Sequence, residues 1–322
     1  MKHIIRIFLV IGIIFFLQNC SNDYSKAKKF ADSGDYKEFY SEISKDVKNG
    51  DKKAKNLLIN YCFKAIQDGD LKQVQYFMQQ QPQLINSIDD EGNRALDVVL
   101  FDEHINIKML KLLSQYNPQL NYIVHYYDMT PLQVIVSGKY ENLEALKLLL
   151  DNGADPNFVG NSNRSKNTPL ILSYVRDKIE TFSLLLKYKA SYEMDNNNIY
   201  DAIASSYALY LHNNGIDLRN FYRKALSPKV ESILNSFGYK TLHRKNMQYL
   251  TILQKYRDKV QKTSCALKKL IKWYIKTKEN RALKFLMKDQ ICRKFLLDMK
   301  EFAMQLNNRA AMYILDESIK GK

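Results

Sequence analysis

Apolar side chains recur at spacings of three and four along most of the chain, with polar residues between them. Two of these clusters are Leu146, Leu149, Leu150 and Phe182, Leu185, Leu186. This spacing places apolar residues on one face of an α-helix, so the pattern predicts amphipathic helices that bury that face. Only 11 glycines and 6 prolines occur in 322 residues, which is too few turn signals for a sandwich or barrel of many short strands. The pattern therefore predicts an all-α fold.

The helical clusters belong to a longer repeat. The leucine-rich segment that begins at Leu143 is similar to segments that begin at Ile107 and Ile179, so the three starts are 36 residues apart. A second match precedes each of them, at Arg94-Ala95-Leu96, Thr130-Pro131-Leu132 and Thr168-Pro169-Leu170. A helix pair of this size cannot bury its apolar face alone. The period therefore predicts a helical solenoid in which neighbouring pairs share one core.

The repeat resembles the ankyrin repeat. The copy that begins near Asp128 has the family's residues at Thr130, Pro131, Leu132, Gly138, Gly153, Ala154, Asp155 and Asn157. In the family pattern, Thr130 caps the first helix, Pro131 lies in its first turn and Gly153 ends the second helix in a left-handed conformation. Gln133 replaces the family's His, and we expect this to weaken one helix-capping hydrogen bond. The period exceeds the usual ~33 residues, so the short finger loops between repeats are expected to carry extra residues.

The resemblance is clear over about residues 87–193, and looser copies extend it on both sides. The turns at Gly34, Gly50 and Gly69 each separate a helix end from a new amphipathic helix. Residues 207–217 resemble a final second helix, but the chain before them is too short for a full helix pair. We therefore expect a truncated unit there.

The C-terminal third also holds two similar segments. They cover residues 281–286 and 309–314, and they are either decayed repeats or merely two antiparallel helices, with a slight preference for the first. The predicted organisation is a signal peptide at 1–19, an N-terminal helical segment at 20–60, ankyrin repeats at 61–218 and a basic helical region at 219–322.

The first twenty residues form a targeting signal. A positively charged start precedes an apolar run over residues 7–17. A membrane-spanning helix needs about 18 or more apolar residues, whereas the core of a secretion signal needs about 7–15. Residues 17–20, which end at Cys20, resemble a bacterial lipoprotein lipobox. Asn19 departs from the family's Gly, Ala or Ser, and an uncleaved membrane-anchoring helix is the alternative.

The lipobox resemblance implies that the Cys20 thiol is acylated and that this residue becomes the new N-terminus. One acyl chain binds a membrane marginally, whereas two hold a protein stably, so the implied diacylglyceryl group would anchor the chain permanently. Ser21 stands where an Asp commonly signals inner-membrane retention in enteric bacteria. We expect a lipid-anchored protein of the bacterial cell envelope, in the outer membrane, on its periplasmic or its outer face.

Basic charge is concentrated near the C-terminus. Residues 241–322 hold 20 Lys and Arg against 7 Asp and Glu, a net charge of +13, whereas the rest of the chain carries +2. Lys268, Lys272 and Lys276 form a helical stripe, with Lys269 beside it. Three interpretations stay open: a phosphate-binding face, a face that contacts anionic lipid or an acidic partner, and a solvated helix face. An exported protein rarely meets DNA, so no nucleic-acid partner is expected.

The sequence contains no recognisable catalytic or metal-binding motif. The histidines outside the signal peptide are His104, His125, His212 and His243. None of them has a second ligand at metal spacing. The run Asp89-Asp90-Glu91 falls in a finger, where we expect a solvated loop. The prediction is therefore a non-enzymatic protein with no cofactor, no metal and no small-molecule substrate.

A protein partner is the remaining function class. Ankyrin stacks bind proteins through their fingers and their concave helix face. Tyr126 and Tyr127 lie near one predicted finger tip, and Phe158 and Arg164 belong to the next finger. Tyrosine is favoured at interface centres because it buries a large area with little loss of rotamer freedom. We expect these four residues to form one contact patch for a protein.

Two roles for such a module stay open. Lipoproteins with short helical repeats resemble immunity proteins that neutralise secreted antibacterial phospholipases. The alternative is a structural or host-facing surface lipoprotein whose basic C-terminal region contacts anionic lipid or an acidic partner.

Overall fold

The computed structural model describes residues 23–102, 104–159, 167–191, 193–194, 197–214, 228–256, 266–287 and 293–320. The predicted lipidation site Cys20 and the contact residue Arg164 lie outside these ranges, as do Cys265 and Cys292. The chain divides into two compact units, Met1–Pro118 and Gln119–Lys322, which are described separately. The predicted domain boundaries at residues 20, 61 and 219 stay predictions.

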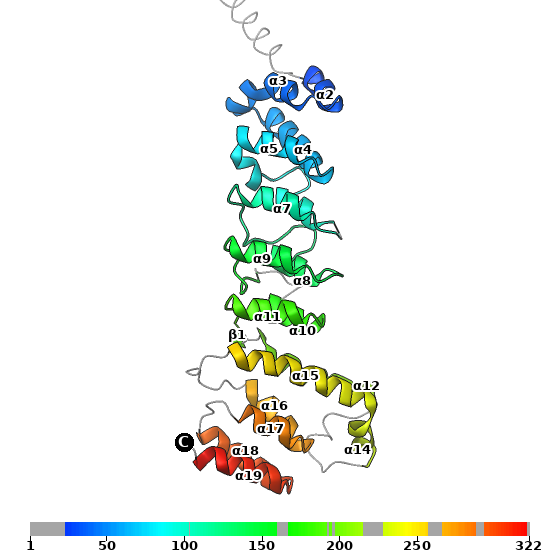
Figure 1. Ribbon diagram of the computed structural model, residues 1–322, viewed down its shortest axis with the longest axis vertical. Coiled ribbons are helices and arrows are strands. Elements are labelled where there is room, and N and C mark those ends of the chain that lie inside the picture. The colour runs from blue at the N-terminus through cyan, green and yellow to red at the C-terminus, as the bar shows by residue number, and fades with distance from the viewer. Residues whose placement is uncertain are drawn as a thin grey trace, which may run out of the picture. The chain divides into compact units, whose positions relative to one another are not determined.

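The first unit is a set of helices joined by tight turns (Figure 1). Its elements are α2 (Ser25–Asp32), α3 (Tyr36–Lys48), α4 (Lys52–Gln67), α5 (Leu71–Gln80), a 3-10 helix at Pro82–Asn86, α6 (Ala95–Leu100) and α7 (Ile107–Ser114). Helix α4 contacts α5 and α6, and α5 contacts α7, so the pairs α4/α5 and α6/α7 stack on each other. Gly34, Gly50 and Gly69 have φ angles of 82°, 88° and 75° at the ends of α2, α3 and α4. The three predicted turns are therefore confirmed as helix ends.

Aromatic and aliphatic side chains fill the core of the first unit. Phe39 and Phe77 are fully buried with an edge-to-face contact at 5.9 Å between ring centroids. Cys62 is also buried and is not in a disulfide, and burial raises the pKa of its thiol to about 12. This thiol is therefore a small apolar packing group at neutral pH.

The second unit begins with two ankyrin-like helix pairs and continues with further helices of 7 to 20 residues. Its elements are α8 (Pro131–Ser137), α9 (Leu143–Asp151), α10 (Pro169–Val175), α11 (Ile179–Lys187), β1 (Glu193–Met194), β2 (Asn197–Asn198), α12 (Ile199–Asn213), α14 (Pro228–Asn235), α15 (Phe237–Tyr256), α16 (Ala266–Lys276), α17 (Asn280–Leu286), α18 (Arg293–Gln305) and α19 (Arg309–Lys320). The strands β1 and β2 are two residues long and pair antiparallel. The regular structure described in both units is otherwise helical, which confirms the predicted all-α helical solenoid.

The start of α8 follows the family pattern, with one correction. The Thr130 hydroxyl accepts a hydrogen bond from the Gln133 backbone N–H at 3.1 Å, and Pro131 opens the helix. We expected Gln133 to weaken the cap, but both capping hydrogen bonds are present. Its side-chain oxygen accepts from the Thr130 N–H at 2.7 Å, and its amide nitrogen donates to the Asn167 carbonyl at 2.7 Å. A glutamine amide carries a donor and an acceptor at one end, so it caps its own helix and bonds to the chain before the next one.

The predicted core of the ankyrin-like pairs is confirmed. The six clustered residues Leu146, Leu149, Leu150, Phe182, Leu185 and Leu186 are all buried. Helix α8 contacts α10 and α9 contacts α11, so the two pairs stack. Gly153 has a φ angle of 93° and its N–H bonds to the Leu150 carbonyl, which is the predicted left-handed helix end.

The expectation of a truncated unit after residue 199 is wrong. Of the predicted second helix at residues 207–217, the described part does not form a separate helix, because α12 runs without a break from Ile199 to Asn213; residues 215–217 lie outside the described ranges. Helix α12 contacts α10, and α15 contacts both α11 and α12 (Figure 1). Helices α12 and α15 thus occupy the places of first and second helix of a full pair. The sequence spacing concealed this pair because α14 and its flanking segments lie between the two helices.

The C-terminal region also consists of stacked helix pairs. Helix α16 contacts α17, and α18 contacts α19; α16 also contacts α18, and α17 contacts α19. Lys278 and Asn307 have φ angles of 58° and 52° at the turns between the helices of each pair. Of the two open interpretations, this arrangement favours repeated helix pairs over a single isolated pair.

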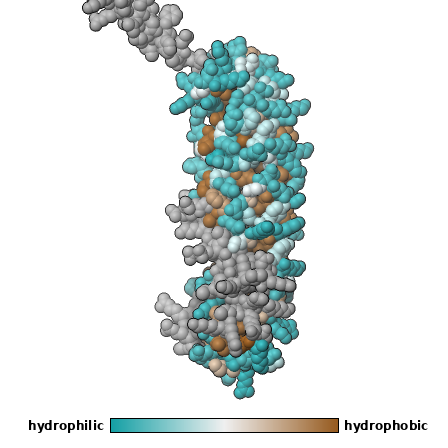
Figure 2. Space-filling view, turned by 90° about the vertical axis from the view of Figure 1, so that its left-hand side faces the viewer, coloured by the Kyte–Doolittle hydropathy of each residue, from teal (hydrophilic) through white to brown (hydrophobic). Residues whose placement is uncertain are grey.

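The surface shown in Figure 2 is a mixture of hydrophilic and small hydrophobic areas over its coloured residues. Among the residues that the structure describes, no helix is both long enough and apolar enough to cross a membrane.

Candidate protein-binding surface

The fingers of the second unit are held in register by two asparagines. The side-chain oxygen of Asn121 accepts from the Asp155 N–H at 2.9 Å, and that of Asn157 accepts from the Ser191 N–H at 2.6 Å. Both bonds join residues 34 positions apart. Each asparagine therefore fixes the start of its own finger to the start of the next one.

The first finger of this unit is a tight hairpin. Val124 and Met129 form a β-bridge, with the Val124 N–H donating to the Met129 carbonyl at 2.8 Å. The Asp128 N–H donates back to the Val124 carbonyl at 2.9 Å, and Asp128 has a φ angle of 55°. These bonds close a six-residue loop whose tip is His125, Tyr126 and Tyr127. The tip is therefore a defined structure rather than a slack loop.

The structure brings the two predicted tip tyrosines together. Their rings meet edge to face with 5.2 Å between centroids, and the side chain of Tyr126 is 73% exposed. Tyr127 is half-buried, and this burial raises its pKa. The Tyr127 ring thus packs against the Tyr126 ring, and the exposed Tyr126 ring presents a large apolar and hydrogen-bonding surface.

The second half of the predicted contact patch is only partly described. Phe158 is half-buried, and its N–H bonds to the Asp155 carbonyl at 3.2 Å. Arg164 lies outside the described residues. A patch that joins Phe158 and Arg164 to the two tyrosines stays a prediction.

Sequence analysis missed two exposed side chains on the turns within the helix pairs. Tyr140 follows α8 and is 47% exposed, and Val175 ends α10 and is 58% exposed. The turn of Tyr140 is fixed by the buried Lys178, whose ammonium donates to the carbonyls of Gly138 and Tyr140 at 2.6 and 3.0 Å. The signal in the sequence was an aromatic residue in an otherwise polar turn, Gly138-Lys139-Tyr140-Glu141.

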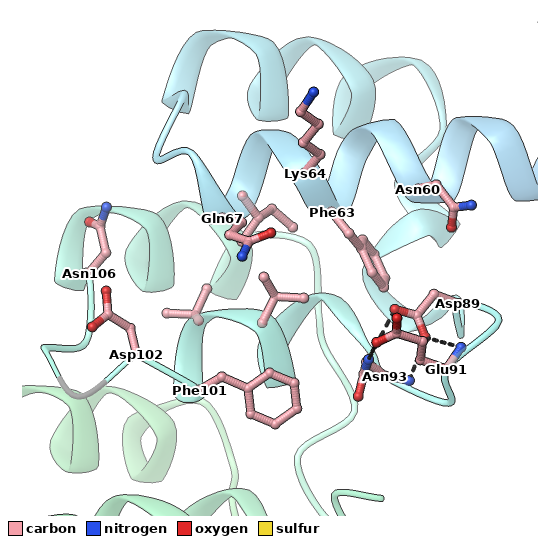
Figure 3. A pocket seen from close by; sticks show the side chains of 13 residues that line it. Asn60, Phe63, Lys64, Gln67, Asp89, Glu91, Asn93, Phe101, Asp102 and Asn106 are labelled. Atoms are coloured by element: carbon pink, nitrogen blue, oxygen red, sulfur yellow. Dashed lines mark hydrogen bonds between the residues drawn. The ribbon is translucent and has the colours of Figure 1, made fainter. Parts of the chain in front are cut away.

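A cavity in the first unit was also missed (Figure 3). It has a volume of about 520 Å³ and lies between α4, α6 and the finger at residues 89–93. Phe63 and Val99 are buried side chains of its wall, and Asp89, Glu91 and Asp102 are acidic ones. The run Asp89-Asp90-Glu91 lies in a finger as predicted, but two of its members also face this cavity.

The predicted basic stripe is wrong at Lys276. This side chain is 3% exposed, and its burial lowers the pKa of the ammonium. Lys272 is half-buried with its ammonium 5.1 Å from the centre of the Phe302 ring, and Lys269 pairs with Asp201 at 3.0 Å. Lys268 is half-buried. Helix α16 contacts α12, α17 and α18; Lys269 is exposed, whereas Lys268 and Lys272 are half-buried and Lys276 is buried, so the four lysines do not form one open face.

The histidines are not brought together at a metal site. His104, His125 and His212 are exposed, and within the described ranges no group of three or more His, Cys, Asp or Glu side chains is placed to hold a metal ion. His243 is half-buried, where its ring nitrogen lies 2.8 Å from the Tyr207 hydroxyl. Burial lowers the pKa of His243, and Glu279 at 3.5 Å opposes that shift.

Comparison with known proteins agrees with the geometry of the first finger and of α8 and α9. The family model described as "Ankyrin repeat" matches residues 127–161. No curated protein matches the chain. An ankyrin repeat is a protein-interaction module, so the matched segment implies a protein partner.

Proposed function

We propose that this chain is a lipid-anchored, non-enzymatic protein-binding module of a bacterial cell envelope. In this proposal the partner docks on the finger tip at Tyr126 and Tyr127 and on the adjoining concave face of the repeats. The observation that carries it is the 73% exposure of Tyr126 on a hydrogen-bonded finger, directly before the matched ankyrin repeat at residues 127–161.

The finger has the physical properties of an interface hot spot. A tyrosine ring that is already held by its neighbour loses little rotamer freedom when it binds. The hairpin bonds at Val124 fix the loop before the partner arrives, so little ordering has to occur on association. Loops on a rigid scaffold are also the usual places for binding residues.

A pulldown from envelope membranes tests the partner surface. The bait is the full chain, as wild type, as Tyr126→Ala with Tyr127→Ala, and as Tyr313→Ala. Tyr313 is an exposed tyrosine of α19 and is the matched control. We expect a partner that wild type and Tyr313→Ala capture equally and that the double variant binds at least ~30-fold more weakly, the equivalent of about 2 kcal/mol. Equal capture by all three baits would move the site to the concave helix face.

The lipobox-like segment at Cys20 supports anchoring. Cys20→Ala removes the thiol that would carry the acyl chains, so the protein should leave the detergent phase of a membrane extract. Unchanged retention of the variant in the detergent phase would refute the proposal that the chain is a lipoprotein.

In its most specific form, the proposal makes the chain an immunity protein against a secreted antibacterial phospholipase. An anchored binder stands at the membrane where such an enzyme acts. Co-expression with a phospholipase encoded by an adjacent gene tests this form: wild type should protect the cells, and the tyrosine double variant should not. Protection by neither chain would leave a binding module with another partner.

A further inference from the structure

Helix α18 carries apolar side chains on two of its sides. Leu296, Met299 and Ala303 are buried and form the side that packs in the core of the second unit. Leu297 and Met304 are instead 51% and 49% exposed. They are seven positions apart, which is about two turns of the helix, so they lie on the same side of it. The packing of this helix pair therefore leaves a second apolar stripe on α18 uncovered.

The preceding helix pair shows what covers this side of a helix within the unit. Ile275 of α16 and Met304 of α18 each stand three residues before a left-handed turn residue, Lys278 and Asn307 respectively. Ile275 is 1% exposed, and its carbonyl accepts a hydrogen bond from the Asn308 side chain of the next pair at 2.8 Å. The position of Met304 is thus one that another helix pair covers. A stacking face that stays open to water normally has polar residues there instead.

Helix α19 carries a matching stripe. Helices α18 and α19 lie side by side and are joined by a short turn, so they run antiparallel (Figure 1). Lys300 of α18 pairs with Asp316 of α19 at 2.5 Å, and 30% and 36% of their side chains are exposed. Met312 and Ile319 are half-buried and stand four residues before and three residues after Asp316.

Each helix therefore presents a charged side chain between two apolar ones, and the two charges are opposite. Because the helices are antiparallel and Lys300 lies level with Asp316, Leu297 lies near the level of Ile319 and Met304 near that of Met312. We call these six residues the end face: Leu297, Lys300, Met304, Met312, Asp316 and Ile319.

The end face has the self-complementary pattern of a two-fold interface, in which residue i contacts residue j and j contacts i. A two-fold axis that runs along the helices, midway between them, places α18 of one copy on α19 of the other. Lys300 of each copy then faces Asp316 of the other, so the four charges alternate in sign around a ring. An axis across the helices would instead place Lys300 on Lys300, where like charges repel.

We propose that the end face binds a second copy of this chain in a two-fold dimer. Leu297 and Met304 of each copy pack on Ile319 and Met312 of the other, which removes apolar surface from water on both sides. The ring of charges lies between these apolar contacts, where it is partly shielded from solvent and fixes the register of the two copies. Another protein would have to carry the same charges at the same levels to fit equally well. The opposite charges on the two helices therefore favour a second copy as the occupant.

Sedimentation velocity of the full chain over a range of concentrations, in a large excess of mild detergent, tests the apolar contacts. The test variant combines Leu297→Ser with Met304→Ser. The matched control combines Val175→Ser with Leu209→Ser, two side chains of α10 and α12 that are each 58% exposed. Circular dichroism melting curves verify that both variants fold.

We expect wild type and control to dimerise equally and the test variant to dimerise at least about tenfold more weakly. A wild-type chain that stays monomeric at every concentration would overturn the proposal and leave the end face to a different protein. Equal dissociation constants for all three chains would also overturn it.

A charge exchange tests whether the two copies recognise each other through the ring. Lys300→Asp combined with Asp316→Lys keeps the ion pair within one chain, so the exchanged chain should fold and dimerise with itself. In a mixed dimer with wild type, each side of the ring would bring like charges together. Tagged wild type should therefore capture untagged wild type at least about tenfold better than the exchanged chain.

Equal capture of the two chains would show that the ring is not in the interface, and it would overturn the proposal. So would an exchanged chain that folds but stays monomeric. The dimer involves α18 and α19, whereas the proposed function places its partner on the finger of Tyr126 and Tyr127, so the two proposals can fail separately.

Discussion

The ankyrin-like pairs α8–α11 and the C-terminal pairs α16–α19 reach the same architecture with different residues. Both regions stack two-helix units, and both end helices on a left-handed residue: Gly153 after α9, Lys278 after α16 and Asn307 after α18. Only the ankyrin-like pairs begin with the Thr-Pro-Leu sequence, at Thr130 and Thr168. The family's local signals are therefore not needed for the stack itself.

The two regions share a less obvious device. Gln133 caps α8 and also bonds to the Asn167 carbonyl, which lies before α10. Asn308 caps α19 through the Ala311 N–H at 3.0 Å, and its amide donates to the Ile275 carbonyl of α16 at 2.8 Å. In each region one buried amide side chain joins a helix start to the backbone of another pair. The C-terminal pairs thus lack the Thr-Pro-Leu sequence of the ankyrin-like pairs but keep the same kind of hydrogen bond between neighbouring pairs.

The largest expected effect on stability comes from placing a charged side chain in the buried core of each region. Leu149→Asp puts an unpaired carboxylate in the core between stacked pairs and should cost at least about 4 kcal/mol. Leu315→Asp is equally buried, but it lies in the last described pair, so it should unfold mainly α18 and α19. Hydrogen exchange with mass spectrometry distinguishes the two outcomes. Loss of protection over the whole second unit in both variants would show that the regions fold as one cooperative block.

Removal of either amide should cost a similar amount. Gln133→Ala and Asn308→Ala each leave a buried backbone group without its partner, at a cost of about 2 kcal/mol. Chemical unfolding of the full chain measures the difference, and Gln248→Ala, an exposed position of α15, is the control. A cost at Gln133 with none at Asn308 would break the parallel between the regions.

A pH dependence should distinguish the C-terminal side of the unit from the ankyrin-like side. Burial lowers the pKa of His243 in the folded chain below its unfolded value of 6.5, although Glu279 opposes the shift. The folded chain then binds fewer protons than the unfolded chain, so stability is present above about pH 6.5 and falls as the pH drops from there toward the folded pKa. The groups that face His243 are Glu279 and the tyrosines Tyr207, Tyr239 and Tyr274.

His243→Asn tests this pH dependence. The variant removes the titrating ring, so its free energy of unfolding should fall less than that of wild type as the pH drops below about 6.5. Parallel pH profiles for wild type and variant would assign the acid sensitivity to other groups.

The smallest expected effects come from exchanging the left-handed residues. Gly153→Ala should cost about 1 kcal/mol, because no atom lies within 4 Å of the added methyl group and the strain is that of the backbone alone. Lys278→Gly should instead stabilise the chain by about 0.5–1 kcal/mol, since Lys278 holds a φ angle of 58°. Thermal melting of both variants shows whether each substitution raises or lowers the stability of the chain. Destabilisation by Lys278→Gly would mean that the lysine side chain contributes more than its backbone conformation costs.

Sequence analysis predicted the local features well because their causes are local. The caps at Thr130, the helix ends at Gly34 and Gly153, and the buried leucines each follow from residue type and spacing. The exposed Tyr126 was also predictable, because an aromatic residue at a finger tip has no packing role.

The features that were missed depend on residues distant in the sequence. The pairing of α12 with α15 spans an insertion, so no repeat spacing revealed it. Lys276 continues a polar stripe in the sequence but is buried by the packing around α16. The cavity of the first unit needs α4 and the finger at residues 89–93 side by side, which hydrophobic periodicity alone does not place.

The asparagine bonds at Asn121 and Asn157 have a consequence for how such a chain evolves. Each bond joins positions 34 residues apart, and the acceptor is a side chain while the donor is a backbone N–H. A backbone donor is supplied by almost any residue, so the joint places no demand on the sequence of the incoming repeat. If one repeat were duplicated or lost here, the asparagine side chain could still accept a hydrogen bond from the backbone N–H of the repeat that follows. Repeat number is therefore a quantity that this architecture leaves open to change, while the fingers diversify independently.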